Sequence, residues 1–182
     1  VMESQRDGYN HLYLLDVNTH DVVQLTKGNW VVQAFVGFNK KTKSIIFRAN
    51  PIDPRQSLVY SVSAKGGKMQ LLSIADGVHS ATLNADGTQL IDNYSSPTLP
   101  HNIDLVDTRS GKKQNVLKAE DPWKEHGYNI PEITSGSIKA SDGVTDLYYR
   151  MVKPINFDPN KKYPTVVYVY GGPHAHNVDA RW

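Results

Sequence analysis

An internal repeat is the feature of this sequence that most constrains its fold. The repeated pattern is an apolar strand, a short polar turn and a second apolar strand, and it occurs over residues 11–26, 57–73 and 102–117. The first strong anchors of the three copies, Leu12, Leu58 and Ile103, lie 46 and 45 residues apart. This period is typical of a four-stranded propeller blade, which buries its faces only by stacking against neighbouring blades. A β-sandwich with coincidental spacing is the alternative.

The local pattern also predicts a mainly β chain. Runs of β-forming residues alternate with turn residues, and no window shows an apolar period of 3.6 residues. Asp86-Gly87 and the glycines of Lys65-Gly66-Gly67 supply the positive φ angles that tight hairpins need. Residues 77–96 are interpreted as the remaining two strands of the second repeat. The expected strands cover residues 12–17, 22–25, 31–36, 44–48, 58–62, 69–72, 79–83, 89–93 and 103–106.

Composition narrows the functional classes. Of the 182 residues, 39% are hydrophobic and 21% are charged, so the chain has enough apolar residues for a packed core. The net charge is +2, and the lysine pairs sit beside turns, so no nucleic-acid partner is expected. The chain has no cysteine, which excludes disulfides, thiolate metal sites and a cysteine nucleophile. No apolar run approaches the ~20 residues that a membrane-spanning helix needs, and no signal peptide is expected.

The character of the sequence changes near residue 120. Residues 121–131 contain two prolines and a glycine and are predicted to form a linker. A hairpin is expected next, followed by a strand from Val166 to Tyr170 that ends at Gly171-Gly172-Pro173. Three further prolines exclude a helix before that strand. Both ends of the chain, at Val1 and Trp182, are expected to be cuts through a longer protein.

The segment GSIKASDGVTDLYYRMVKPINFDPNKKYPTVVYVYGGPHAH, residues 136–176, resembles a known junction. It is similar to the propeller-to-catalytic-domain junction of the prolyl oligopeptidase clan, and most similar to the dipeptidyl peptidase IV family. SQRDGYNHLYLLD and SSPTLPHNIDLVD resemble blade segments of that family. The resemblance implies C-terminal blades of a partial β-propeller at residues 1–120 and a linker at 121–131. It places the first strands of a truncated α/β-hydrolase domain at 132–182.

The resemblance also implies a site residue. In this family the tyrosine before the glycine-proline turn donates its hydroxyl to the oxyanion, a role that falls on Tyr170. A phenol at the end of an apolar strand is a suitable rigid donor, although a buried core tyrosine is the alternative. No Gly-x-Ser-x-Gly nucleophile motif and no adjacent pair of glutamates occurs. The catalytic Ser, Asp and His and the amine-binding acids are therefore expected outside this chain, which alone would be inactive.

The function implied for the parent protein is that of a serine exopeptidase. It would release Xaa-Pro or Xaa-Ala dipeptides from peptide amino termini through an acyl-enzyme, and the family analogy adds an extracytoplasmic location. A homodimeric parent is left open. The alternatives are a propeller used as a protein-binding module with a degenerate hydrolase domain, and an acylaminoacyl peptidase or oligopeptidase.

Other candidate sites carry less weight. No cofactor or metal is expected, because His174 and His176 with Asp179 lack a further ligand and a defined geometry. Asn93 opens a glycosylation sequon but falls on a predicted strand, and His101 is predicted to be a surface turn residue. The remaining aromatic candidates, Trp30 and Trp123, are predicted to pack within a blade and within the linker.

Overall fold

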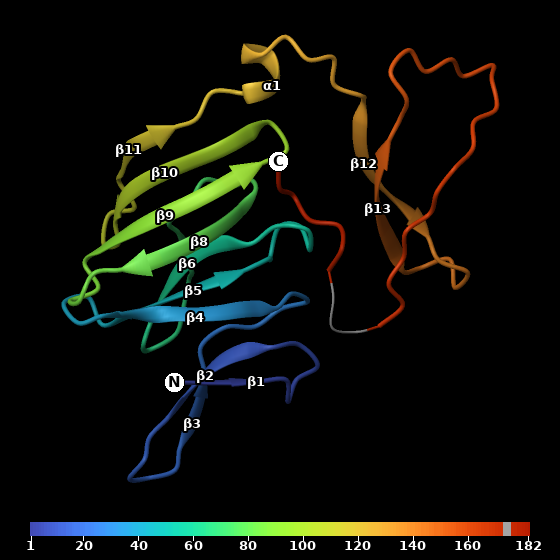
Figure 1. The fold of residues 1–182 in the computed structure, drawn as a ribbon. Helices are drawn as coiled ribbons and strands as arrows, with labels where there is room; N and C mark the ends of the chain where they lie inside the picture. Colours follow the sequence, from blue (N-terminus) through green and yellow to red (C-terminus); the bar gives the residue numbers. More distant parts are fainter. Residues whose placement is uncertain (173–175) are drawn as a thin grey trace. The chain divides into compact units, whose positions relative to one another are not determined.

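The computed structural model describes residues 1–172 and 176–182, which form two compact units (Figure 1). The first unit contains residues 1–120 and 179–182, and the second contains residues 121–178. The first unit is built from three antiparallel sheets. Their strands, in spatial order, are β1 (Met2–Ser4), β2 (His11–Leu15) and β3 (Val22–Gln24); β4 (Val32–Asn39), β5 (Ser44–Ala49), β6 (Leu58–Ser63) and β7 (Gln70–Leu71); and β11 (Lys113–Lys118), β10 (Leu99–Asp107), β9 (Gln89–Ser96) and β8 (Val78–Leu83).

These sheets confirm the mainly β fold and correct the phase of the repeat. The strands over residues 77–96 do not complete a sheet with β6 and β7. They are β8 and β9, which pair with each other, and β9 also pairs with β10, so both strands belong to the sheet of β10 and β11. The three similar segments are thus the last two strands of each sheet. The period was predicted correctly, but the blade boundary falls after β7, because its two residues pair only with β6 and end the sheet there.

Two apolar layers hold the three sheets together. Because side chains of a strand alternate between its faces, β5 and β6 contribute to both layers. Ile45 and Phe47 pack with Leu12 of the first sheet. Ile46 packs with Leu90 of the third sheet. All five of these side chains are fully or almost fully buried, so the middle sheet is covered on both faces.

Polar contacts also join the middle and third sheets. Asn39 at the end of β4 donates its side-chain N–H to the Thr108 hydroxyl over 2.8 Å. The Thr108 hydroxyl in turn donates to the carbonyl of Gly87 over 2.6 Å. Gly87 has a φ of +74°, and a Cβ at this position would collide with the backbone of Phe38 and Asn39. The glycine is therefore required both by the β8–β9 turn and by the close approach of β4.

In residues 121–172 and 176–178, the described part of the second unit, the structure contains one helix and one hairpin. The expected hairpin forms from β12 (Ile133–Lys139) and β13 (Asp146–Val152), which pair along their whole length. The predicted linker is less irregular than expected, because it contains the four-residue helix α1 (Pro122–Glu125). Asp121 caps this helix by accepting from the backbone N–H of Trp123, and proline at the first helical position favours it.

The strand expected over Val166–Tyr170 is not formed. These residues have no regular secondary structure, and the structure records no strand paired with them. A strand requires a neighbour for its backbone hydrogen bonds, and none of the described residues supplies one. No helix in the described part of the chain is long and apolar enough to cross a membrane.

Candidate functional site

The Tyr170 segment is an exposed apolar stretch. Val166 is 96% exposed and Tyr168 81%, whereas Tyr170, at the end of the stretch, is 51% exposed. A Cβ at Gly172 would lie 2.7 Å from the Tyr170 hydroxyl oxygen, so glycine at this position lets the chain turn closely past the tyrosine ring. Pro173 and His174 lie outside the described residues, and His176 is exposed.

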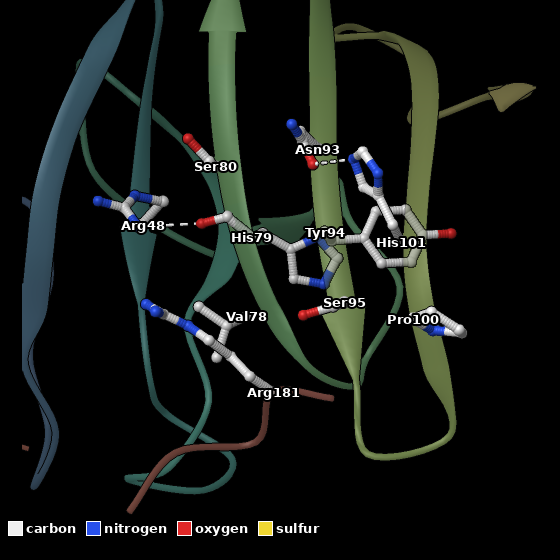
Figure 2. A pocket seen from close by; sticks show the side chains of 10 residues that line it. All are labelled: Arg48, Val78, His79, Ser80, Asn93, Tyr94, Ser95, Pro100, His101 and Arg181. Atoms are coloured by element: carbon white, nitrogen blue, oxygen red, sulfur yellow. Dashed lines mark hydrogen bonds between the residues drawn. The ribbon is translucent and has the colours of Figure 1, made fainter. Parts of the chain in front are cut away.

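A pocket of about 330 Å³ lies in the first unit, on the middle and third sheets (Figure 2). Its walls come from β5, from the first residues of β8, from the last residues of β9 and from the start of β10, together with Arg181. Neighbouring strands of an antiparallel sheet run in opposite directions. The start of β8, the end of β9 and the start of β10 therefore lie at the same edge of the sheet. The volume is within the range of small-ligand sites.

The basic side chains that line the pocket are two arginines and two histidines. They are Arg48 and Arg181, with His79 and His101, and no lining residue is acidic. Arg48 donates to the carbonyl of His79 over 2.9 Å, and Figure 2 shows this bond and the guanidinium group of Arg181 nearby. Burial lowers the pKa of Arg48, and the like charge of Arg181 lowers it further. The pocket is therefore electropositive.

A buried histidine–aspartate pair supports the floor of this pocket. His79 Nδ1 lies 2.8 and 2.9 Å from the two carboxylate oxygens of Asp92, and His79 Nε2 lies 2.8 Å from the carbonyl oxygen of Asp76. Both ring nitrogens thus face acceptors. These contacts hold the imidazole ring at both of its nitrogens and fix its orientation behind the pocket.

Tyr94 extends this pair into a network across the third sheet. Its ring stacks on His79 with a centroid distance of 4.6 Å. Its hydroxyl donates to Asp104 over 3.1 Å and accepts from the Asn102 side chain over 3.1 Å. Burial raises the pKa of Tyr94, and the Asp104 carboxylate contributes to the same shift. The network fixes the side chains behind the pocket and keeps the phenol protonated.

The remaining candidates from the sequence are distributed over both units. Asn93 lies in β9 as expected, and its side-chain oxygen is 2.8 Å from His101 Nε2. The prediction for His101 is wrong: it lies within β10, because the β9–β10 turn is completed before it. Trp30 packs edge-on against His11 and borders the apolar layer between the first and middle sheets. Trp123 contacts Tyr128 next to α1.

Sequence reasoning missed Arg48, His79 and Asp92. One signal was present: Leu90, Asp92 and Tyr94 alternate along β9 on the face that is buried. A carboxylate on such a face requires a partner, and the neighbouring strand β8 of the same sheet supplies His79. No group of three potential His, Cys, Asp or Glu metal ligands occurs among residues 1–172 and 176–182. His174 falls outside these ranges, so the metal prediction stays a prediction.

Comparisons with known proteins place this chain in a family. Residues 1–101 match the model of the dipeptidyl peptidase IV (DPP IV) N-terminal region. Dipeptidyl peptidase 4 of Trichophyton equinum is 32% identical over 98% of this chain, and that of Arthroderma otae is 34% identical over the same share. The chain spans 24% of the length of each of these relatives, about a quarter.

Solved structures agree with this match. A Bacteroides ovatus protein, named as a candidate dipeptidyl aminopeptidase IV, is 46% identical with a TM-score of 0.88, over 99% of this chain and 28% of its own. Porphyromonas gingivalis dipeptidyl peptidase 4 is 26% identical, also with a TM-score of 0.88, over 98% of this chain and 25% of its own. The stacked antiparallel sheets match the N-terminal propeller region of such proteins, and the chain belongs to the dipeptidyl peptidase IV family.

Proposed function

We propose that the protein to which this chain belongs is a serine exopeptidase that releases Xaa-Pro or Xaa-Ala dipeptides from peptide amino termini. The observation that carries the proposal is the family match over residues 1–101, joined to relatives that are named dipeptidyl peptidase 4. A serine nucleophile attacks the scissile carbonyl and forms an acyl-enzyme, which water then hydrolyses. The triad and the amine-binding acids are contributed by parts of the protein beyond this chain.

The domain boundaries in this proposal are residues 1–120 for the blades, 121–131 for the linker and 132–182 for the start of an α/β-hydrolase domain. The exposed run from Val166 to Tyr170 supports the last of these assignments. Four successive residues from Val166 are at least 78% exposed, and a β-forming run of this kind is expected to be a strand of a larger, buried sheet. The neighbouring strands of that sheet would come from the rest of the hydrolase domain.

Tyr170 is assigned as the oxyanion donor. Acyl transfer places negative charge on the scissile carbonyl oxygen, and a phenol already aimed at that position stabilises the charge without reorganising. The close approach of Gly172 to the ring of Tyr170 supports this role, because a residue with a Cβ at this position would collide with the phenol.

The test is Tyr170→Phe in the full-length protein, assayed with a chromogenic Xaa-Pro substrate. Phenylalanine keeps the ring and removes only the hydroxyl, so kcat and kcat/KM should both fall about 10²–10³-fold. Tyr168→Phe removes a hydroxyl from the same run and should leave turnover near normal. Unchanged kcat with a lowered melting temperature would remove Tyr170 from the site. Absence of turnover and of active-serine labelling in the unmodified protein would instead favour a binding module.

A further inference from the structure

We infer that the pocket on β5, β8, β9 and β10 is a binding site for a carboxylate group of a peptide, with Arg48 as its principal contact. The inference goes beyond the proposed peptidase activity, because it concerns binding on the blades and needs no turnover.

The first argument is the uncompensated charge of Arg48. Its guanidinium group donates to the His79 carbonyl over 2.9 Å and reaches the Ser57 hydroxyl at 3.4 Å, and both of these acceptors are neutral. No carboxylate of the described chain lies within ion-pair distance of Arg48. Burial disfavours an uncompensated charge, and an anion beside the half-buried guanidinium group would offset that cost. The missing anion is therefore expected from a ligand.

The second argument is the position of Arg181. This residue lines the same pocket, and its charge lowers the pKa of Arg48. Its own partner is Asp179, whose carboxylate lies 3.1 Å from Nε, and the Arg181 side chain is 61% exposed. Two like charges on one small pocket repel each other, and an anion between them removes that repulsion. Figure 2 shows both guanidinium groups on the same side of the pocket.

The third argument is the rigidity of the surroundings. The bond from Arg48 ends on the backbone of His79, whose ring is fixed by Asp92 and by the stacked Tyr94. Arg48 is thereby held in place before any ligand arrives, which lowers the entropy that binding must overcome. The hydroxyls of Ser80 and Ser95 also line the pocket and provide neutral donors for the second oxygen of a carboxylate.

A carboxylate on a peptide has two sources, the C-terminus and an acidic side chain, and the experiment separates them. Isothermal titration calorimetry on the full-length protein would compare N-acetyl-tetra-alanine as the free acid and as the C-terminal amide. A second pair would compare N-acetyl-Ala-Glu-Ala-Ala-amide with its glutamine counterpart. The acid of at least one pair should bind about tenfold more tightly than its neutral partner, as expected for one charge-assisted hydrogen bond.

Variants connect that preference to the pocket. Arg48→Gln should abolish the tenfold preference, and Arg48→Lys should restore part of it, because lysine keeps the charge but not the planar fork. Arg109→Gln removes the same charge from the exposed turn after the opposite end of β10 and should change nothing. If Arg48→Gln lowers the melting temperature too far, Arg181→Gln provides a second variant and should also weaken the preference.

Three results would overturn the inference. The first is equal binding of charged and neutral peptides in both pairs. The second is equal loss of the preference in Arg48→Gln and Arg109→Gln, which would indicate only general surface charge. The third is a preference for the acid that an equal concentration of inorganic phosphate abolishes, which would indicate an unspecific anion site.

Discussion

The buried pair of His79 and Asp92 permits a quantitative test of how the third sheet is held together. Asp92→Ala removes the carboxylate that lies 2.8 Å from His79 Nδ1, where the two side chains are 1% and 0% exposed. Removing one partner of a buried pair costs about 3–5 kcal/mol of unfolding free energy, because the other partner is left without compensation. His79→Leu should have a cost in the same range, since it leaves both the Asp92 carboxylate and the Asp76 carbonyl without a donor.

The double variant His79→Leu/Asp92→Ala distinguishes this reasoning from simple loss of packing. Once one partner is absent, removal of the other relieves an uncompensated group, so the double variant should cost about 2–3 kcal/mol less than the sum of the single variants. Urea unfolding of the chain, followed by tryptophan fluorescence, measures each free energy. Asp21→Ala, in an exposed turn, serves as the control and should cost under about 1 kcal/mol. Additivity within about 0.5 kcal/mol would refute the coupling.

Three further outcomes are expected. Gly87→Ala should destabilise the first unit by about 1–3 kcal/mol in urea unfolding, because a Cβ would meet the Phe38 carbonyl at a positive φ, and a wild-type midpoint would contradict the close approach of β4. Hydrogen bonding from Thr88 lowers the pKa of the Asp86 carboxyl below its ordinary value of 3.8. Its contribution to stability is therefore present above that value and lost as the pH falls through the lower folded pKa. Turn hydrogen bonds lower the pKa of Asp16, Asp107 and Asp142 in the same way. Unfolding midpoints should thus be constant above about pH 5 and fall below about pH 4, whereas a midpoint that rises on acidification would contradict the assignment. Finally, residues 1–182 alone should show no turnover of an Xaa-Pro substrate and no labelling by an active-serine reagent, and labelling of any serine in this chain would overturn the proposed location of the nucleophile.

Much of the first unit could be predicted from the sequence because its strands are short, β-rich and separated by specific turn residues. The expected run at 44–48 became β5 (Ser44–Ala49), and the run at 58–62 became β6 (Leu58–Ser63). The phase of the blades could not be predicted in the same way. Hairpin signals occur on both sides of β8 and β9, so the sequence pattern alone leaves open which sheet these strands join.

The pocket was missed for a different reason. Arg48, His79 and Arg181 are far apart in the sequence, and none of them belongs to a local motif that indicates a binding site. Arg48 follows a buried run in which residues on both faces are apolar, so the side that faces the third sheet was not evident. Only the pairing of sheets across that face brings the guanidinium group to the His79 carbonyl. Long-range convergence of this kind has no local signature.

The middle sheet is covered on both faces, so its backbone amides should be protected from hydrogen exchange more strongly than those of the two outer sheets. In a stack where each layer contacts only its neighbours, stability is a sum of the layers and of the interfaces between them. The middle sheet, which contains β5 and β6, has such an interface on each of its two faces. The strands β3 and β11 lie at the edges of the first and third sheets, so each has a side without a paired strand. Slow hydrogen exchange should therefore be concentrated in the centre of the stack, and opening should proceed from its two outer layers inward.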